Sequence, residues 1–208
     1  MISVINILLV KGLEIDGFKI EFCENTYIPS DDTYLLYDSI KSLEKIMGPA
    51  LEIGCGIGLI SLKLASKNVR VVSIDINPYA VKCTYNNAKR NNLDKNIDVI
   101  CCNMFDALRE GIMFNLIVFN PPYLPYNGEK LDNYSRAYIG GLNGSEITKF
   151  FLKDVHKYLD DNGIIYLLQS SISDIIRRKP IIVKKIFFEE LRIYRLDKHT
   201  LRTLENNI

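Results

Sequence analysis

The sequence has only two histidines, His156 and His199, which lie far apart without carboxylates arranged around them. Cysteines number five, an odd count that lacks the spacing of metal ligands. They are Cys23, Cys55, Cys83, Cys101 and Cys102. These absences argue against a metal site and against catalysis by a histidine triad. Because no secretory signal is recognisable, we expect the cysteines to be reduced and mostly buried, in a cytoplasmic protein.

Excess charge and long apolar runs are also lacking. The formal net charge is +1, so no overall positive field favours binding to a nucleic-acid backbone. The apolar run Met1–Val10 is too short to span a membrane and lacks the features of a signal peptide, so we expect an initial strand. With 208 residues, 48% of them hydrophobic and 25% charged, the chain is typical of one soluble globular domain.

Strands and helices alternate along the chain. Turn signals at Gly12 and Asp16-Gly17 predict a hairpin extension within residues 1–26, packed on a single domain that spans residues 1–208. Strands are expected at Ala50–Ile53, Val69–Ile74, Ile97–Cys101, Phe114–Phe119 and Ile164–Leu168, and a C-terminal antiparallel hairpin at Ile181–Phe188 and Leu191–Leu196. Helices are expected from Ser30 or Asp31 to near Gly48, then at Leu59–Ser66, Tyr79–Asn91, Ser145–Leu159 and Ile172–Lys179. The pattern predicts an α/β fold, a Rossmann-like, doubly wound, mostly parallel sheet of seven strands.

One strand of this sheet must end abruptly. The apolar run Phe114–Phe119 is followed by Asn120-Pro121-Pro122-Tyr123, and two prolines cannot continue a central strand because neither donates to the ladder. An amide, a carbonyl and an aromatic ring are therefore left at the carboxyl end of a strand, where ligands bind in open α/β sheets. The alternative is a stiff turn without a ligand.

A second motif favours the ligand-binding interpretation. The strand Ala50–Ile53 runs into a glycine turn, Glu52 to Gly58, and Asp75 ends the following strand, which is a nucleoside-binding arrangement. The dinucleotide fingerprint requires Gly or Ala where this chain has Leu59. The acid Glu52 would repel a pyrophosphate but suits the cationic end of S-adenosylmethionine, which we therefore favour over a nicotinamide dinucleotide or an empty glycine turn.

The chain resembles the class I S-adenosylmethionine-dependent methyltransferases with an N-P-P-Y motif. It is most similar to the release factor glutamine methyltransferases of the eukaryotic and archaeal type, the HemK-like family. The resemblance extends over about residues 19–169, and the tail after about Gln169 matches poorly. Four segments carry it: Tyr27–Thr33, Glu52–Gly58, Asn120–Tyr123 and Ala137–Glu146.

The resemblance implies a role for each site residue. Thr33, Glu52, Gly54 and Gly56 would line the methionine end of the cofactor, with Cys55, Gly58 and Ile76 beside it. Asp75 would hold the ribose, and Asn103 and Met104 would flank the adenine. Asn120, Pro121, Pro122 and Tyr123 would form the catalytic group, with Asn120 also touching the cofactor. Asn103 departs from the family, which usually has aspartate there, but an amide oxygen still accepts a hydrogen bond.

These residues suggest a mechanism in which methyl transfer yields S-adenosylhomocysteine. The Asn120 amide oxygen and the Pro121 carbonyl would accept the two N–H bonds of a planar nitrogen, orienting its lone pair and stabilising the charge that develops on it. Tyr123 would pack against the planar group. The acceptor implied by the resemblance is the glutamine of the Gly-Gly-Gln loop in a class I release factor. An adenine or guanine amino group in RNA or DNA is the alternative, and a non-enzymatic binding protein is a third.

A partner is also implied. Family members of this type often work with a small zinc-binding activator that extends the sheet, and Ile97–Cys101 is expected to be an apolar edge strand that invites such pairing. The alternative is that the N-terminal hairpin or a loop covers this edge.

Overall fold

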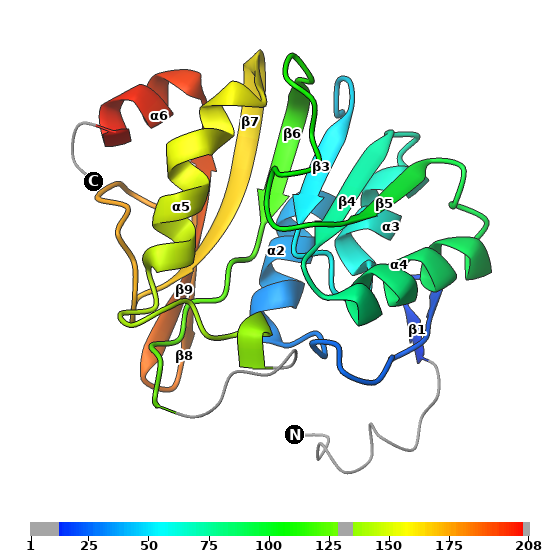
Figure 1. Cartoon of the computed structure of the whole chain (residues 1–208), viewed down its shortest axis with the longest axis horizontal. Helices are drawn as coiled ribbons and strands as arrows, with labels where there is room; N and C mark the ends of the chain where they lie inside the picture. The colour runs from blue at the N-terminus through cyan, green and yellow to red at the C-terminus, as the bar shows by residue number, and fades with distance from the viewer. Residues whose placement is uncertain (1–12, 129–134, 206–208) are drawn as a thin grey trace.

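The computed structural model describes residues 13–128 and 135–205. Its main sheet has seven strands in the order β5-β4-β3-β6-β7-β9-β8 (Figure 1). The strands are β3 (Ala50–Ile53), β4 (Val71–Asp75), β5 (Ile97–Cys101), β6 (Phe114–Phe119), β7 (Leu159–Ser170), β8 (Ile182–Ile186) and β9 (Glu189–Leu196). The five neighbouring strands β5, β4, β3, β6 and β7 are parallel to one another, whereas β9 runs antiparallel to both β7 and β8. The predicted fold class is confirmed.

Alternation of side chains along β6 divides the core into two layers. Leu116 and Val118 join a cluster with the apolar sides of α2 (Asp31–Lys41), α3 (Leu59–Ser66) and α4 (Pro78–Arg90). Ile117 and Phe119 face the opposite cluster, which includes residues of α5 (Glu146–Asp154) and α6 (Lys198–Glu205). Because both faces of β6 are buried, its sequence reads as a continuous apolar run. Within the described residues, no helix is long and apolar enough to cross a membrane.

A two-stranded antiparallel sheet, β1 (Leu13–Ile15) and β2 (Phe18–Ile20), precedes the main domain. It lies beside α4 (Figure 1), where the side chains of Asn91 and Asn87 accept from the backbone N–H groups of Lys19 at 2.9 Å and Glu21 at 2.8 Å. The predicted turn at Asp16-Gly17 joins the two strands. The strand expected at Met1–Val10 lies outside the described residues.

The expectation that all five cysteines are reduced is wrong for two of them. Cys23, just after β2, and Cys83, on α4, form a disulfide, with Cα atoms 5.9 Å apart. Docking of the hairpin on α4 brings the two residues within the range that a disulfide spans. Cys55, Cys101 and Cys102 are free, and of these only Cys55 is buried.

The observed helices differ from the predicted ones in their ends and in their number. The helix α2 ends at Lys41, well before Gly48, and α5 ends at Asp154 and continues as the 3₁₀ turn η2 (Val155–Lys157). The segment 172–179 is not helical, because the Asp174 carboxylate accepts from Ile176 N at 2.8 Å and from the Arg192 guanidinium at 2.8 Å, which holds the segment in turns against β9. The helix α6 was not predicted.

Candidate active site

A cavity of about 690 Å³ lies at the carboxyl ends of the parallel strands. This volume is typical of cofactor and small-ligand sites. All of the predicted site residues except Gly58 line it. They are Thr33, Glu52, Gly54, Cys55, Gly56, Asp75, Ile76, Asn103, Met104, Asn120, Pro121, Pro122 and Tyr123. The fold therefore brings the glycine turn and the Asn-Pro-Pro-Tyr segment to the two sides of one cavity, as expected at this edge of an open sheet.

The glycine turn is held in place by Asp75. Its Oδ2 accepts from Gly56 N at 3.0 Å and its Oδ1 accepts from Asn77 N at 2.9 Å, at the start of α4. Burial raises the pKa of the Asp75 carboxyl, and these backbone donors oppose that rise. Each carboxylate oxygen has a second lone pair. Asp75 can therefore hold the turn and still accept from hydroxyl groups of a ligand in the cavity.

Glu52 is the buried acid of the site. Its side chain accepts a hydrogen bond from Ser61, whose hydroxyl lies 2.5 Å from that of Ser73. Burial raises the pKa of Glu52 to about 8, with the charge of Asp75 adding to the rise and the Ser61 hydrogen bonds opposing it. A carboxyl buried in this way is stabilised in its charged form by a nearby cation. Glu52 is thus suited to the cationic end of a ligand in the cavity.

Gly58, unlike the other glycines of the motif, does not line the cavity but lies at the start of α3. It precedes the first residue of α3 with a φ of +85°, and a Cβ there would lie 2.9 Å from the Thr84 side chain of α4. The absence of a side chain therefore permits a left-handed helix start and close packing of α3 on α4. The structure supports a packing role for Gly58, and it does not place the residue on the cavity wall.

The proposed adenine end is formed by loops that follow β4 and β5. Ile76 is half-exposed and Met104 is buried, and both line the cavity. Asn103 is exposed, with its Nδ2 3.5 Å from Asp106 Oδ2, which is a weak hydrogen bond. Its amide is therefore available to a ligand, and the predicted role of Asn103 stays a prediction.

The sequence analysis missed Asp32, which lines the cavity and organises the hydrogen bonds of Asn120 and Tyr123. This residue of α2 is only 4% exposed, and its Oδ2 accepts from Asn120 Nδ2 at 3.1 Å and from Tyr123 OH at 3.4 Å. Tyr27 OH donates to the same carboxylate at 3.1 Å. Asp32 lies within Tyr27–Thr33, one of the four segments that carry the resemblance, but the sequence analysis assigns it no role in the site. The signal that could have identified it is the adjacent pair Asp31-Asp32, since one acid is enough for a helix N-terminus.

The carboxylate of Asp32 fixes the orientation of the Asn120 amide. A carboxylate only accepts hydrogen bonds, so the NH₂ group of Asn120 must face Asp32 and the amide oxygen must face away. That oxygen, Oδ1, is buried and has no hydrogen-bond partner among the residues that the structure describes. Burial, with the charge of Asp32 adding to it, raises the pKa values of Tyr27 and Tyr123, so both hydroxyls remain donors.

The segment Ala137–Glu146 packs directly on the backbone of the Asn-Pro-Pro-Tyr stretch. Leu124 N donates to Tyr138 O at 2.8 Å, and Gly140 N donates to Leu124 O at 2.9 Å. A Cβ on Gly140 would lie 2.4 Å from Pro122 O, and one on Gly144 would lie 2.3 Å from Tyr123 O. Only glycine permits this approach. The segment therefore holds the Asn-Pro-Pro-Tyr stretch in position.

Comparison with known proteins agrees with this geometry. The family model described as the methyltransferase small domain matches residues 31–137. A putative protein N5-glutamine methyltransferase of Methanocaldococcus jannaschii is 37% identical over 195 residues, which cover 87% of this chain and 96% of that protein. A release factor glutamine methyltransferase of Aquifex aeolicus is 31% identical over 163 residues, which cover 72% of this chain and 56% of that protein.

Among solved structures, the fold is similar to that in the E. cuniculi Mtq2–Trm112 complex, which is described as responsible for methylation of the translation termination factor eRF1. The TM-score is 0.62, the sequence identity is 22%, and the match covers 84% of this chain and 99% of that one.

Proposed function

The chain belongs to the methyltransferase small domain family and is an S-adenosylmethionine-dependent N-methyltransferase, and on this premise we propose that it methylates the side-chain nitrogen of a glutamine. The glutamine lies in the Gly-Gly-Gln loop of a class I translation release factor. The two relatives described above are at least 30% identical and are named for glutamine methylation, one of them for release factors.

The observation that carries the proposal is the buried, unpaired Oδ1 of Asn120. A buried acceptor without a partner is costly, and the groups that complete it are usually water or a ligand. Asn120 lines the cavity, so an N–H group of a planar amide bound there can supply the missing donor. The Pro121 carbonyl, at the same strand end, would accept the second N–H.

The residues of the cavity also fit the methyl donor. Gly56 has open space where a Cβ would stand, Glu52 offers a buried carboxyl to a cation, and Asp75 retains lone pairs for ribose hydroxyls. When bound, S-adenosylmethionine supplies an electrophilic methyl group. Thr33, Cys55, Ile76, Asn103 and Met104 complete the cavity wall around it.

Chemistry at the amide nitrogen depends on orientation rather than on a strong base. The lone pair of an amide nitrogen is delocalised, so holding both N–H bonds on fixed acceptors would direct the lone pair and stabilise the developing positive charge. One N–H proton would then be lost to solvent after transfer, which leaves the neutral N-methyl amide. Asp32 fixes the acceptor Asn120 and also the ring of Tyr123, through hydrogen bonds of 3.1 Å and 3.4 Å. Tyr123 would pack against the amide plane, and Pro122 keeps the segment stiff.

Incubation with labelled S-adenosylmethionine tests the proposal. Purified archaeal- or eukaryotic-type class I release factor, the same factor with the loop glutamine replaced by alanine, and total RNA are offered as acceptors. We expect label only in the unaltered release factor, and mass spectrometry should place it on the loop glutamine. Label in RNA, or equal label in the alanine variant, would contradict the proposed acceptor.

A small partner subunit is the second part of the proposal, supported by the two-protein complex to which the fold is similar. The strand β5 is confirmed as an edge strand. The described hairpin β1–β2 packs on α4, so the backbone edge of β5 has no paired strand among the residues described. We propose that the activator extends the sheet at β5 and, by family resemblance, that it binds zinc.

Co-expression tests the partner. We expect a stable one-to-one complex containing zinc, higher activity than the chain alone, and slower amide exchange in β5 within the complex. If the chain alone is monodisperse and fully active, with no gain when the activator is added, the partner is not needed.

A further inference from the structure

The turn between β8 and β9 breaks the usual rules for a tight hairpin. Ile186 pairs with Glu189, so only Phe187 and Phe188 form the loop, and Phe187 has a φ of +46°. Two-residue loops favour glycine, asparagine or aspartate at positive φ, because a Cβ is strained there. The two aromatic side chains are 96% and 104% exposed, so packing within the chain does not compensate for this strain.

This hairpin tip lies beside the mouth of the cavity. Lys184 of β8 makes a 2.7 Å ion pair with Asp31, the residue next to Asp32 on α2. Glu189, directly after the tip, is close enough to Tyr123 for its charge to raise the pKa of that phenol. The tip is therefore attached to the same wall of the cavity that carries the catalytic group.

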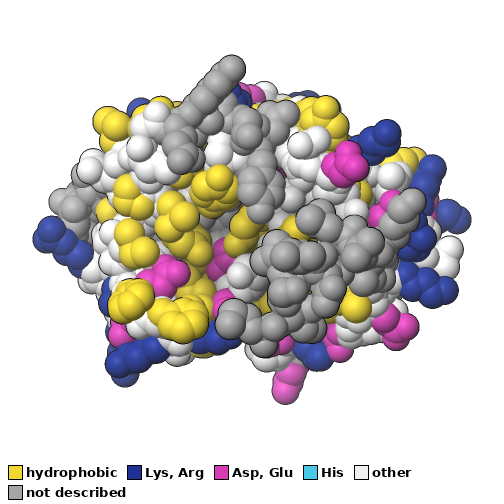
Figure 2. All heavy atoms as spheres, turned by 90° about the horizontal axis from the view of Figure 1, so that it is seen from below, with side chains coloured by type: hydrophobic (Ala, Val, Ile, Leu, Met, Phe, Trp, Pro, Cys, Tyr) yellow, Lys and Arg dark blue, Asp and Glu magenta, His cyan; other side chains and the backbone are white. Residues whose placement is uncertain are grey.

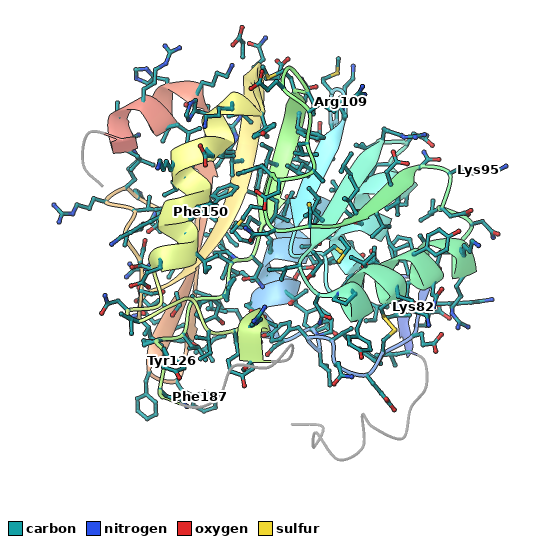
Figure 3. The ribbon with its side chains drawn as sticks, viewed as in Figure 1. Lys82, Lys95, Arg109, Tyr126, Phe150 and Phe187 are labelled. Carbon is teal, nitrogen blue, oxygen red and sulfur yellow. A yellow bond between two sulfur atoms is a disulfide. The ribbon has the colours of Figure 1, made fainter. Side chains whose placement is uncertain are left out.

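Two further exposed apolar side chains belong to the wall of the cavity. Tyr126 and Leu142 both line the cavity and are 38% and 75% exposed. Tyr126 and Phe187 both lie at the lower left end of the molecule in the view of Figure 3. Seen from that end, apolar side chains gather on the described part of the surface (Figure 2). We call Tyr126, Leu142, Phe187 and Phe188 the rim surface.

We propose that the rim surface binds the folded domain of the release factor that presents the glutamine, an inference that rests on the proposed function. Contiguous exposed apolar surface marks interaction sites, and aromatic side chains supply much of the energy at protein interfaces. Tyr126 and Leu142 of the rim surface line the cavity that would receive the glutamine, so a protein docked there has its loop at the cavity mouth. The occupant is thus the substrate protein.

A second copy of this chain is a poorer occupant. The edge strand β8 presents Lys184 and Lys185, and the latter is 82% exposed. Lysines on an exposed edge oppose strand pairing between two like molecules. The hairpin also needs no help from its tip to fold, because β9 is held to the core by buried Leu191 and Ile193.

The test compares a folded substrate with a short one. In the double variant Phe187→Asn, Phe188→Ser, asparagine tolerates the left-handed turn and neither change removes buried surface. We expect KM and Kd for the intact release factor to rise at least tenfold, while kcat stays within about twofold and Tm does not fall. The ratio of kcat/KM for the intact factor to that for a short Gly-Gly-Gln peptide should fall by at least tenfold. Phe150→Ser, at a half-exposed phenylalanine on α5, is the matched control. It should leave both the KM for the intact release factor and the ratio of the two kcat/KM values unchanged.

The outcomes separate two failures. If the unaltered enzyme methylates the release factor and the double variant has the same KM and Kd for it, the rim surface is not the docking site, and the proposed function stands. If the unaltered enzyme transfers no methyl to any release factor, the proposed function fails and the docking inference fails with it. A concentration-dependent dimer that the double variant abolishes would assign the surface to a second copy and overturn the inference.

Discussion

Asp32 and Asn120, 88 positions apart in the sequence, are joined by a hydrogen bond of 3.1 Å from the amide Nδ2 to the carboxylate Oδ2. This bond leaves the Oδ1 of Asn120 as a buried acceptor with a fixed direction. The amide cannot rotate by 180° without placing its oxygen against a carboxylate. In the proposed function, a substrate amide would meet an acceptor whose orientation is set before binding, which would lower the reorganisation needed during transfer.

Replacing Asp32 by asparagine should remove this constraint. Two facing amides can pair in either orientation, so Asn120 would no longer be held with its oxygen toward the substrate. A hydrogen bond to a charged group contributes about 1.5–3 kcal/mol, and we expect kcat to fall about 10- to 100-fold. Steady-state kinetics and calorimetry with S-adenosylmethionine should show that the loss is in kcat, with cofactor Kd within about threefold.

The neighbouring Asp31→Asn is the matched control for that variant. Asp31 is an exposed residue whose ion pair with Lys184 lies on the surface. Surface ion pairs contribute about 0–1 kcal/mol, so its substitution should leave kcat within about twofold. Equal losses in the two variants would show that the carboxylate of Asp32 does not act through Asn120.

Glu52 should release a proton when the cofactor binds. Its pKa of about 8 in the free protein means that it is largely protonated at pH 7, and a cationic ligand favours the ionised form. Cofactor affinity should therefore rise with pH toward 8, by up to about tenfold per unit, and level off above that value. Calorimetry in two buffers of different ionisation enthalpy measures the number of protons released when the cofactor binds. The Glu52→Gln variant should release none.

The raised pKa of Glu52 should also make the stability of the cofactor-free protein depend on pH. Stability should fall as pH rises, whereas cofactor affinity should increase. The folded chain holds a proton on Glu52 that the unfolded chain releases above its ordinary pKa of 4.5. The contribution of Glu52 to the free energy of unfolding should therefore decrease as pH rises from about 4.5 to about 8. A Glu52→Gln variant whose urea midpoint follows the same pH profile as the unaltered protein would contradict this assignment.

Two glycines of one motif should respond differently to alanine. Gly58→Ala places a methyl group against Thr84 and strains a left-handed residue, so the free energy of unfolding should fall by at least about 1–2 kcal/mol with little change in cofactor Kd. Gly56→Ala has the same kind of backbone strain, but its methyl group enters open space on the cavity wall. Its cofactor Kd should rise at least tenfold. Equal Kd changes in the two variants would place both glycines at the ligand.

The disulfide between Cys23 and Cys83 should stabilise the chain. It closes a loop with a sequence separation of 60 residues, for which the chain-entropy estimate is about 4 kcal/mol. Urea unfolding with and without a reductant should show the difference, and Cys23→Ser should remove the effect of the reductant. A midpoint that is the same in both conditions would mean that the hairpin is held by its hydrogen bonds to α4 alone.

The central part of the fold could be predicted because its signals are local. The β6 run is apolar on both faces and is followed by two prolines, and the glycine turn marks the end of β3. The C-terminal part could not be predicted in the same way. Asp174 is held by Arg192 and Tyr194, both on β9, so long-range contacts override the apolar pattern of 172–179.

The site shows the same division between local and distant information. The glycine turn and Asp75 were predicted from spacing along the chain, whereas Asp32 and the disulfide depend on pairs that are far apart in the sequence. The helix α6 did have a local signal that was overlooked. Asp197 accepts from Thr200 N at 2.8 Å and from its hydroxyl at 2.7 Å, which is an ordinary start for a helix.

Single-turnover methylation by Asn120→Ala, with cofactor Kd measured in parallel, tests most directly whether the buried amide oxygen is the substrate acceptor. The variant should lose transfer to the release factor by at least a thousandfold, about 4 kcal/mol, while its cofactor Kd stays within several-fold. Asp75→Ala should behave in the opposite way, with a weaker cofactor complex and a smaller loss of rate at saturation. Transfer by Asn120→Ala at the unaltered rate would contradict the assignment of this residue as the acceptor.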